Sequence, residues 1–387
     1  MKLRIAHFAD THLGYRQYGL SERENDFYER FDEIIDHMID NDVDCVIHSG
    51  DLFESPKPPI KALLTAQQGF MRLVSHNIPV YVIAGNHDKM QKSNTEIPQR
   101  LFENEHFHIV EKGKTYTIND DVFIGGLQYI SPNYQEQITN FANEIKQKGE
   151  SYKYKILILH GGLEKFDQYS KEFELNTIPD NFDYYAMGHI HKRYISSFKD
   201  GIMCYPGSTE LRTKKELDDY KKNGKGYTLV TIDDEKDDID VQHVNIPLKR
   251  EYIIKEIKYP KLEEKLVEIN DEIKDLEVKP ILDLTVKEGN FEKSDVLEKI
   301  DEIIGDNALS IRCICNPTIT EPDGIEKWDN LTPEKALENR IVNDNFGENE
   351  NNIIHLTTSL YHELSIPNEE EALHIADDYF EKNYGGR

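Results

Sequence analysis

Residues 3–12 read LRIAHFADTH, an apolar run that ends in an aspartate, a threonine and a histidine. The same arrangement returns at four later places, where an apolar run ends in GD, GNHD, HG or GHIH. In a sheet of parallel strands such ends meet at one edge, which is where α/β proteins keep their active sites. The five runs therefore predict an α/β fold whose site is built from strand ends.

Short apolar runs alternate with amphipathic stretches up to about residue 245, which is typical of a layered α/β domain. A helix is expected at 21–40, where Ser21 and Glu24 have the spacing of a capping box, and another at 58–76. The expected strands are 3–9, 44–49, 79–85, 122–127, 155–161 and 183–189, with further strands at 202–205, 226–233 and 239–246. We therefore predict a four-layer αββα core over residues 1–245.

The pattern changes near residue 246, and residues 251–320 then read strand, helix, strand, helix, strand. This order predicts a smaller α+β domain at 246–320. Residues 321–387 are acidic and rich in asparagine, so we expect a linker with a C-terminal helical tail that binds a partner. The flexible part is expected at 343–352, between short helices at 333–341 and 368–380.

Bulk composition bounds the function. The formal charge of −27 argues against nucleic-acid binding, because basic surfaces release counterions from phosphates. The charge is uneven, however, since residues 329–387 hold 13 Asp plus Glu against 4 Lys plus Arg. A bound metal pair would also add positive charge where a phosphate must sit.

The sequence shows no clear membrane-spanning run, signal peptide or cysteine motif. No run approaches the roughly 18 apolar residues of a membrane span, and the chain reaches His7 and Asp10 before a signal-type apolar region forms. The four cysteines show no CxxC pair, which indicates neither a zinc knuckle nor a disulfide scaffold. We expect a cytoplasmic protein without a membrane segment.

The polar strand ends carry residue types that ligate divalent cations. Carboxylate oxygens suit hard cations, and imidazole widens the choice to manganese, iron and zinc. Asp10 and His12 can turn toward one ion, and Asp51 can bridge two ions roughly 3.5–4 Å apart. Four further side chains complete the predicted pair: Asn86, His160, His189 and His191.

The GNHD loop also holds the predicted catalytic residue. His87 follows Asn86 on a tight turn, where it can stabilise developing charge or protonate a leaving oxygen. Asp88 is expected to orient this loop or His87, as carboxylates behind metal ligands do. Any one of the histidines alone would more often be structural. Seven ligand-type residues at five strand ends predict a dinuclear site for phosphoester hydrolysis.

The set DTH, GD, GNHD, HG and GHIH, in this order, resembles the calcineurin-like metallophosphoesterase superfamily. Longer runs resemble the archaeal double-strand-break repair nucleases of the Mre-eleven or SbcD type, namely FADTHLGY (8–15), SGDLFESPKPP (49–59), AGNHDK (84–89), GHIHKRY (188–194) and YPGS (205–208). The likeness covers about residues 1–320 and thins out in the tail.

That resemblance implies two Mn²⁺ per subunit, with Mg²⁺ as a substitute, and cleavage of DNA as a single-strand endonuclease and a three-prime-to-five-prime double-strand exonuclease. It would give one ion Asp10, His12, Asp51 and His191, and the other Asp51, Asn86, His160 and His189. The domain at 246–320 would cap the site and orient DNA. One departure stands at Glu54, where relatives can carry a histidine three residues after the bridging aspartate.

The resemblance also implies partners and a location at the nucleoid. An SMC-like coiled-coil ATPase of the Rad-fifty or SbcC type would bind the C-terminal tail. A homodimer would form through helices at 58–76 and 94–104.

Two basic stretches with interleaved tyrosines, 192–199 and 212–226, follow the GHIH edge and can contact phosphates. A solvated loop is the plain alternative. The candidate DNA contacts near these stretches and after DTHLG are Tyr15, Arg16, Lys192 and Arg193.

Two other functions fit the same residues. One keeps the chemistry on a phosphoprotein or on a small or cyclic phosphodiester, although GD is followed by LFE rather than the DRG of phosphoprotein phosphatases. The other is a non-catalytic DNA-end clamp with structural metals. An intact His87 and a full ligand set weigh against the clamp.

Overall fold

The computed structural model describes residues 2–90, 96–111, 113–163, 165–166, 172–318 and parts of 332–384. The chain divides into two compact units. The first holds Met1–Ile257, Lys261–Val286 and Lys293–Cys315, and the second holds Lys258–Pro260, Lys287–Glu292 and Asn316–Arg387. The domain limits expected at residues 245 and 320 stay predictions.

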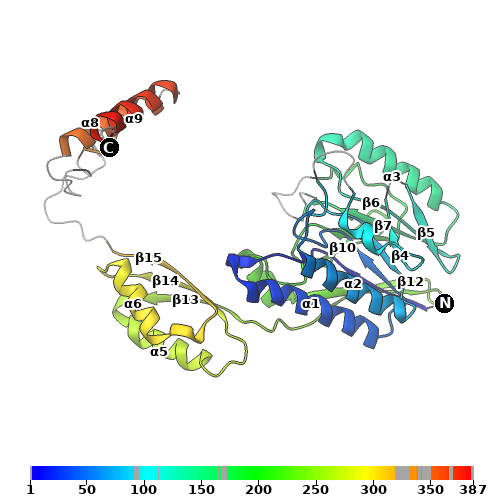
Figure 1. The fold of residues 1–387 in the computed structure, drawn as a ribbon. Coiled ribbons are helices and arrows are strands. Elements are labelled where there is room, and N and C mark those ends of the chain that lie inside the picture. Colours follow the sequence, from blue (N-terminus) through cyan, green and yellow to red (C-terminus); the bar gives the residue numbers. More distant parts are fainter. Residues whose placement is uncertain are drawn as a thin grey trace. The chain divides into compact units, whose positions relative to one another are not determined.

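Two six-stranded sheets dominate the first unit (Figure 1). The first has the order β12-β11-β1-β2-β3-β4, with β1 at Lys2–Phe8, β2 at Cys45–His48, β3 at Val80–Val82, β4 at Phe107–Ile109, β11 at Gly226–Asp233 and β12 at Asp238–Asn245. The second has the order β5-β6-β7-β8-β10-β9, with β5 at Thr115–Ile118, β6 at Val122–Leu127, β7 at Tyr154–His160, β8 at Tyr184–Gly188, β9 at Tyr194–Phe198 and β10 at Gly201–Tyr205. Strands β1 to β4 are parallel, as are β6, β7, β8 and β10, so each set ends at one edge.

The sheets are stacked because their strands carry apolar side chains on both faces. Ile5 of β1 pairs with Cys45 and Val230 on its two sides, and all three lie in the core between the sheets. Phe8, on the other face of β1, packs under the helices.

Helices close the sandwich on both sides (Figure 1). Helices α1 (Ser21–Asp40) and α2 (Ile60–Ser75) cover the first sheet, and α3 (Gln135–Gly149) covers the second. The predicted αββα fold is therefore confirmed, although α3 was not among the predicted helices.

Short helices fill the loops of this unit, at η1 (Gln17–Gly19), η3 (Pro132–Tyr134), η4 (Lys214–Glu216) and α4 (Leu217–Asn223). The helix expected at 94–104 is reduced to a 3-10 helix, η2 (Pro98–Phe102). Ile97 is extended because it precedes a proline, which prevents an earlier start at that position. Residues 91–95 lie outside the described part of the chain.

The order predicted for 251–320 is confirmed element by element: β13 (Tyr252–Lys258), η5 (Tyr259–Lys261), α5 (Leu262–Ile273), β14 (Ile281–Lys287), α6 (Lys293–Ile303), η6 (Gly305–Asn307) and β15 (Ser310–Asn316). The strands form a sheet of order β13-β14-β15. Leu266 and Ile269 of α5 and Val296 and Ile300 of α6 are buried, as the helical spacing of these apolar residues requires.

Two helices of 16 residues stand near the C-terminus, α8 (Glu350–Ser365) and α9 (Glu369–Tyr384). Helix α9 matches the helix expected at 368–380. The flexible linker expected at 343–352 is wrong at its last three residues, because α8 begins at Glu350; residues 343–349 lie outside the described part. None of the helices that the structure describes is long and apolar enough to cross a membrane.

Candidate metal centre

The polar strand ends of both sheets meet at one place. Asp10, Asp51 and Asn86 follow β1, β2 and β3 of the first sheet. His160 ends β7 of the second sheet, and His189 follows β8. The stacking of the sheets thus brings together residues 179 positions apart in the chain, as in the hydrogen bond from the backbone N–H of His189 to Asp10 Oδ1 at 3.0 Å.

Among the described residues, three groups of side chains have ligand atoms within 4.8 Å of one another. The first is Asp10, His12 and His191, the second is Asp51, His160 and His189, and the third is His12, Glu54 and His87. In the first group the Nε2 atoms of His12 and His191 are 3.1 Å apart. All of these side chains offer oxygen or imidazole ligands, which fit a divalent transition-metal ion.

Asn86 and Asp51 link the second group and join it to the first. Asn86 Oδ1 lies 3.0 Å from His160 Nε2 and 3.1 Å from His189 Nδ1. Asp51 Oδ2 lies 3.3 Å from His160 Nε2 and 3.9 Å from His12 Nε2. The Asp51 carboxylate therefore stands between the two groups, as a bridging ligand must.

Hydrogen-bond acceptors orient two of the histidine rings from the side that faces away from the metal centre. His160 Nδ1 donates to the Ser49 carbonyl at 2.8 Å, and His191 Nδ1 donates to Glu216 Oε1 at 3.1 Å. A proton kept on Nδ1 leaves the lone pair of Nε2 for a metal ion. This arrangement orients both rings before any ion arrives.

The other two histidines have carboxylates in the same position. His12 Nδ1 lies 2.9 Å from Glu54 Oε2. His189 is turned the opposite way round, with Nδ1 toward Asn86 and Nε2 3.4 Å from Glu172 Oε1. Each ring thus has one nitrogen toward the centre and the other near a carboxylate, although the contact of His12 with Glu54 is one of distance and not a hydrogen bond.

Glu216 is itself fixed in the protein interior. Lys225 Nζ lies 2.9 Å from Glu216 Oε2, and the Ser208 hydroxyl donates to the same oxygen at 2.8 Å. Burial acts to raise the pKa of Glu216, but Lys225 and His191 outweigh it and hold the pKa well below its usual range. The carboxylate behind His191 is therefore ionised.

Asp51 and His160 form a buried ion pair in the metal-free protein. Burial opposes both charges, yet the neighbouring Asp51 raises the pKa of His160 to about 9. The same neighbour effect holds the pKa of Asp51 below its usual range. A cation that ligates His160 has to displace this proton.

Asp88 ties the two loops of the first sheet together. Its carboxylate accepts backbone N–H bonds from Leu52 at 3.2 Å, Phe53 at 2.9 Å and Gly85 at 2.9 Å. Gly85 must be a glycine at this crossing, because a Cβ there would lie 2.1 Å from Asp51 Oδ1. These contacts support the expectation that Asp88 orients the loop.

His87 differs from the ligand-type histidines in its exposure. It is 26% exposed, whereas His160 is fully buried. Its Nδ1 donates to the Glu54 carbonyl at 2.9 Å, so Nε2 is the ring nitrogen turned away from that acceptor. The ring lies edge-on to His12 with centroids 4.9 Å apart, which places an accessible imidazole beside the buried centre.

Sharp backbone bends aim several ligand-type side chains. Asp10, His12, Asp51 and His189 all have positive φ, from 45° to 92°. Such values cost about 1 kcal/mol or more each for residues other than glycine. The chain thus turns abruptly after each strand and directs these side chains to one point.

The predicted DNA contacts are placed unequally. Lys192 is exposed, and Arg16 is 55% exposed beside Glu24 at 3.1 Å. Tyr15 is half-buried. Arg193 is 3% exposed, and its guanidinium donates to backbone carbonyls, including that of Asn223 at 2.9 Å. This burial removes Arg193 from the candidate DNA contacts, because its charge is used inside the protein.

The sequence did not identify the acceptors behind the histidines. Ser49 directly precedes the GD motif, so its position alone could have marked it. Glu172 belongs to no motif, and Glu216 forms a capping box with Thr213 at η4, a pattern that marks the start of a helix and not a metal centre. Glu54 was noted as a departure from the family pattern, without its contact to His12.

Comparisons with known proteins identify the family. Residues 3–193 match the model of the calcineurin-like phosphoesterases. The DNA double-strand break repair protein Mre11 of Methanococcus maripaludis is 35% identical over 391 residues, which cover 99% of this chain and 100% of that protein. The chain belongs to the Mre11 family of calcineurin-like phosphoesterases.

Other members of the family agree over most of the chain. The Mre11 protein of Methanocaldococcus jannaschii is 33% identical, covering 99% of this chain and 100% of its own length. That of Sulfurisphaera tokodaii is 31% identical, covering 91% of this chain and 92% of its own length. The predicted resemblance is confirmed, and membership makes the protein a hydrolase of phosphoesters that works with divalent metal ions, which the two groups of side chains fit.

Proposed function

We propose that this protein is a nuclease that processes DNA ends at double-strand breaks. It would act as a single-strand endonuclease and a three-prime-to-five-prime double-strand exonuclease at the nucleoid. The observation that carries the proposal is the pair of ligand groups joined by Asp51, with an accessible His87 beside them. Relatives that cover nearly the whole chain are named as double-strand break repair proteins, which supports DNA as the substrate.

The two groups and their bridge suggest a ligand set. We assign one ion to Asp10, His12, Asp51 and His191, and the other to Asp51, Asn86, His160 and His189. Manganese suits this mixture of oxygen and imidazole ligands, and magnesium is the expected substitute. Two such cations supply Lewis-acid activation of the phosphodiester and of the attacking water.

The remaining chemistry falls to His87. Hydrolysis of a phosphodiester breaks a P–O bond, and the leaving oxygen needs a proton or a hydrogen bond as negative charge develops on it. The Nδ1 atom of His87 is held by the Glu54 carbonyl, so its Nε2 side is the one available to the leaving oxygen. Asp88 acts at a distance, by fixing the loops that carry Asp51 and Asn86.

The deciding experiment is degradation of end-labelled linear duplex DNA by the full chain with manganese, magnesium or a chelator. We expect manganese-dependent cleavage that falls about 100-fold or more in His87→Ala, in the range of a lost general acid. The matched control is His106→Ala, at an exposed histidine just before β4 and thus at the opposite end of the strands. Metal content should stay unchanged in both variants.

The same experiment separates the alternatives. A folded, metal-loaded protein that leaves DNA intact but hydrolyses bis(4-nitrophenyl) phosphate would be a small-molecule phosphodiesterase. A protein that binds DNA ends and cleaves neither substrate would be a clamp. Loss of metal in His87→Ala would contradict the separation of ligands from the catalytic residue.

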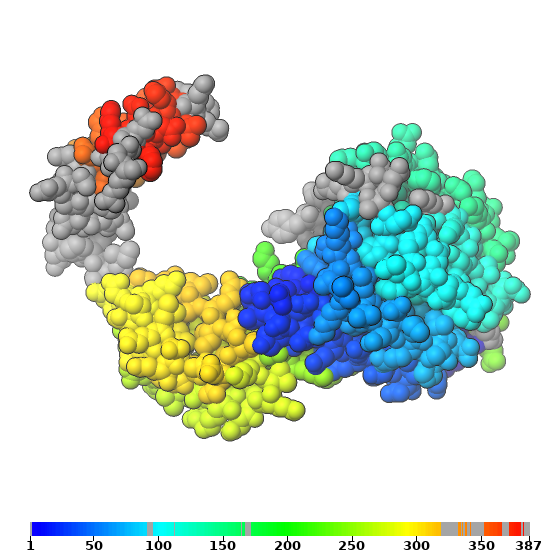
Figure 2. All heavy atoms as spheres, in the orientation of Figure 1, coloured from blue at the N-terminus to red at the C-terminus, as the bar shows by residue number. Residues whose placement is uncertain are grey.

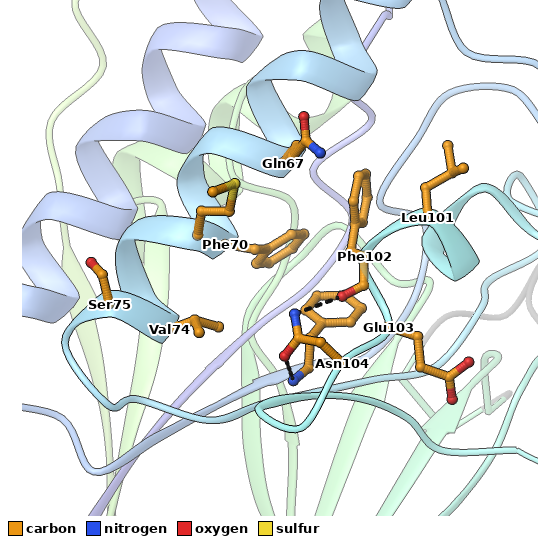
Figure 3. A pocket seen from close by; sticks show the side chains of 10 residues that line it. Gln67, Phe70, Val74, Ser75, Leu101, Phe102, Glu103 and Asn104 are labelled. Carbon is orange, nitrogen blue, oxygen red and sulfur yellow. Dashed lines mark hydrogen bonds between the residues drawn. The ribbon is translucent and has the colours of Figure 1, made fainter.

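An apolar groove between α2 and η2 supports the homodimer. Phe70 and Val74 of α2 line one side and Phe102 of η2 faces them (Figure 3), in a cavity of about 500 Å³. The surfaces of the two elements adjoin on one face of the unit (Figure 2). Met71 and Leu101 line the same groove and are 62% and 68% exposed.

We propose a second copy of the chain as the occupant of this groove. Exposed apolar patches of this kind mark association surfaces. Sedimentation should show a dimer that Met71→Asp dissociates, while Lys153→Ala, at the start of β7, does not. A wild-type monomer at high micromolar concentration would refute the dimer.

Helices α8 and α9 are proposed to bind the coiled-coil ATPase. Leu364, Leu373 and Phe380 are largely exposed apolar side chains on these helices, whereas Ala372 is buried. Exposed apolar side chains on a helix, such as Leu373 and Phe380 seven residues apart on α9, fit a partner helix or coiled coil. Leu373→Ser with Phe380→Ser should spare DNA cleavage and abolish co-purification of the ATPase; persistent co-purification would contradict the proposal.

A further inference from the structure

Arg212 is held over the rim of the metal centre from two sides. One guanidinium nitrogen donates a hydrogen bond of 2.7 Å to Glu54 Oε1, and the guanidinium carbon lies 5.0 Å from the ring centroid of Tyr15. The backbone carbonyl of Arg212 accepts a hydrogen bond of 2.8 Å from the side chain of Gln17. Both ends of the residue are therefore fixed, although its side chain remains 22% exposed.

Glu54 connects this guanidinium to the centre. Its Oε2 lies 2.9 Å from His12 Nδ1, and its Oε1, which accepts the bond from Arg212, lies 3.7 Å from His87 Nδ1. A single carboxylate thus touches Arg212, a proposed metal ligand and the proposed catalytic residue. Arg212 lies one carboxylate away from the place where a phosphodiester would react.

The charges explain why an arginine is needed there. Glu54 brings a negative charge to a site that must receive an anionic phosphodiester, and like charges repel. Arg212 neutralises that carboxylate. A guanidinium has five N–H donors in a planar fork, and among the described residues Glu54 is the one side chain that Arg212 pairs with. The remaining N–H donors of the guanidinium can donate hydrogen bonds to the oxygens of a phosphate.

We propose that Arg212 binds a non-bridging phosphate oxygen of the substrate and that Glu54 is the positioning residue that holds the guanidinium in place. The inference rests on the proposed phosphodiesterase function but not on DNA as the substrate, because any phosphodiester presents these oxygens. Arg212 would then be the principal cation that meets the substrate at the centre.

The first test uses the full chain with manganese and bis(4-nitrophenyl) phosphate. Arg212→Ala should lower kcat/KM about 10- to 100-fold, the range of a lost charge-assisted hydrogen bond, with most of the change in KM. Arg212→Lys should recover part of the lost kcat/KM, because an ammonium keeps the charge but cannot donate two parallel hydrogen bonds. Lys153→Ala removes one ion-paired cation at the opposite end of β7 and should change kcat/KM less than about twofold.

A binding measurement removes the dependence on turnover. Calorimetry with inorganic phosphate and the metal-loaded protein should show that Arg212→Ala weakens binding by about the same factor as it raises KM. Metal content and the unfolding midpoint should stay near those of the wild type, so that a merely structural ion pair is distinguished from a substrate contact.

The role of Glu54 is tested by a double-mutant cycle. Glu54→Gln should raise KM in the wild-type background, because the guanidinium loses its ion-pair partner, and should leave KM unchanged or lower it in the Arg212→Ala background, where it removes an unneutralised negative charge. Full additivity would remove Glu54 as the positioning residue of Arg212.

The outcomes also separate this inference from the proposed function. If Arg212→Ala leaves both KM and phosphate affinity within twofold in a folded protein, Arg212 does not bind the substrate, whether or not DNA is cleaved. If DNA is left intact while diester hydrolysis depends on Arg212, the nuclease proposal fails and the role of Arg212 stands.

Discussion

The metal centre and its rim are constructed differently. The centre takes its side chains from strand ends, where backbone bends aim them and buried acceptors orient them, as Ser49 does for His160. The rim consists of loops whose side chains are held by ion pairs, as Glu24 holds Arg16. A substitution in the centre therefore disturbs several fixed groups at once, whereas a substitution on the rim changes one contact. We expect large losses in the centre and graded losses on the rim.

The largest effect is expected from Gly85→Ala. The added Cβ would lie 2.1 Å from Asp51 Oδ1 and 2.4 Å from the Asp51 backbone nitrogen, so the bridging carboxylate must move. Metal analysis should show the loss of at least one ion per chain, and DNA cleavage should fall about 100-fold or more, as for loss of metal catalysis.

The control for this substitution is Gly305→Ala. Gly305 also has a positive φ, but nothing lies within 4 Å of its added Cβ. It should therefore cost about 1 kcal/mol of stability and no metal. Equal metal content in the two variants would show that the centre tolerates displacement of Asp51.

A smaller effect is expected from Asp88→Asn. The buried carboxylate accepts three backbone N–H bonds, and an amide presents only one acceptor oxygen in place of two. Unfolding in urea should show a loss of about 2–3 kcal/mol, the range for an unsatisfied buried hydrogen-bonding group. Asp36→Asn, at an exposed carboxylate paired with Arg72, should change stability by less than about 0.5 kcal/mol.

Metal binding should depend on pH, with an effect smaller than that of Asp88→Asn. The pKa of His160 is raised to about 9 in the metal-free protein, so at neutral pH the ring carries a proton that an ion must displace. Because that proton competes with the metal below pH 9, affinity for manganese should rise up to about tenfold per pH unit as pH increases toward 9. Calorimetry in two buffers of different ionisation enthalpy should detect about one proton released; no release would contradict the raised pKa.

The smallest effect is expected on the rim, at Lys192→Ala. An exposed lysine that touches a phosphate contributes mainly through counterion release, so DNA affinity should fall a few-fold and the salt slope by about one. Arg193→Ala, one residue further on, should instead lower stability, because carbonyls such as that of Asn223 lose a buried donor. A change in salt slope for Arg193→Ala would reverse our placement of these two residues.

The same contrast explains what the sequence could predict. The centre was predictable because each ligand-type residue directly follows an apolar strand, and strand ends converge in this fold whatever the loops do. On the rim, the sequence does not show whether a basic residue is buried. Arg193 was therefore predicted to contact DNA, which its burial contradicts, and Arg212 was not distinguished from the basic residues that follow it. The carboxylates of Glu172, in a loop, and of Glu216, in η4, reach the histidines only through tertiary packing.

In the C-terminal tail, helix α8 was not predicted, whereas helix α9 was. Ile353, Leu360 and Leu364 recur at a helical spacing in α8, but no helix was predicted over this segment, and the linker predicted at 343–352 overlaps only the first three residues of α8. The β-branched residues of α8 weaken its intrinsic helix preference. Helix α9, which contains Glu, Ala and Leu in its first turns, has a stronger intrinsic preference and was predicted.

The origin of the ligand-type side chains in two separate sheets has a mechanical consequence. Each proposed ion takes ligands from both, since Asp10 and Asn86 belong to the first sheet while His191 and His160 belong to the second. Apolar contacts join the two sheets through their middle, and the ions would fasten them along one edge. Removing the metal should therefore loosen that edge first, speeding hydrogen exchange at the carboxyl ends of the strands and lowering the melting temperature. The catalytic ions would therefore also stabilise the contact between the two sheets.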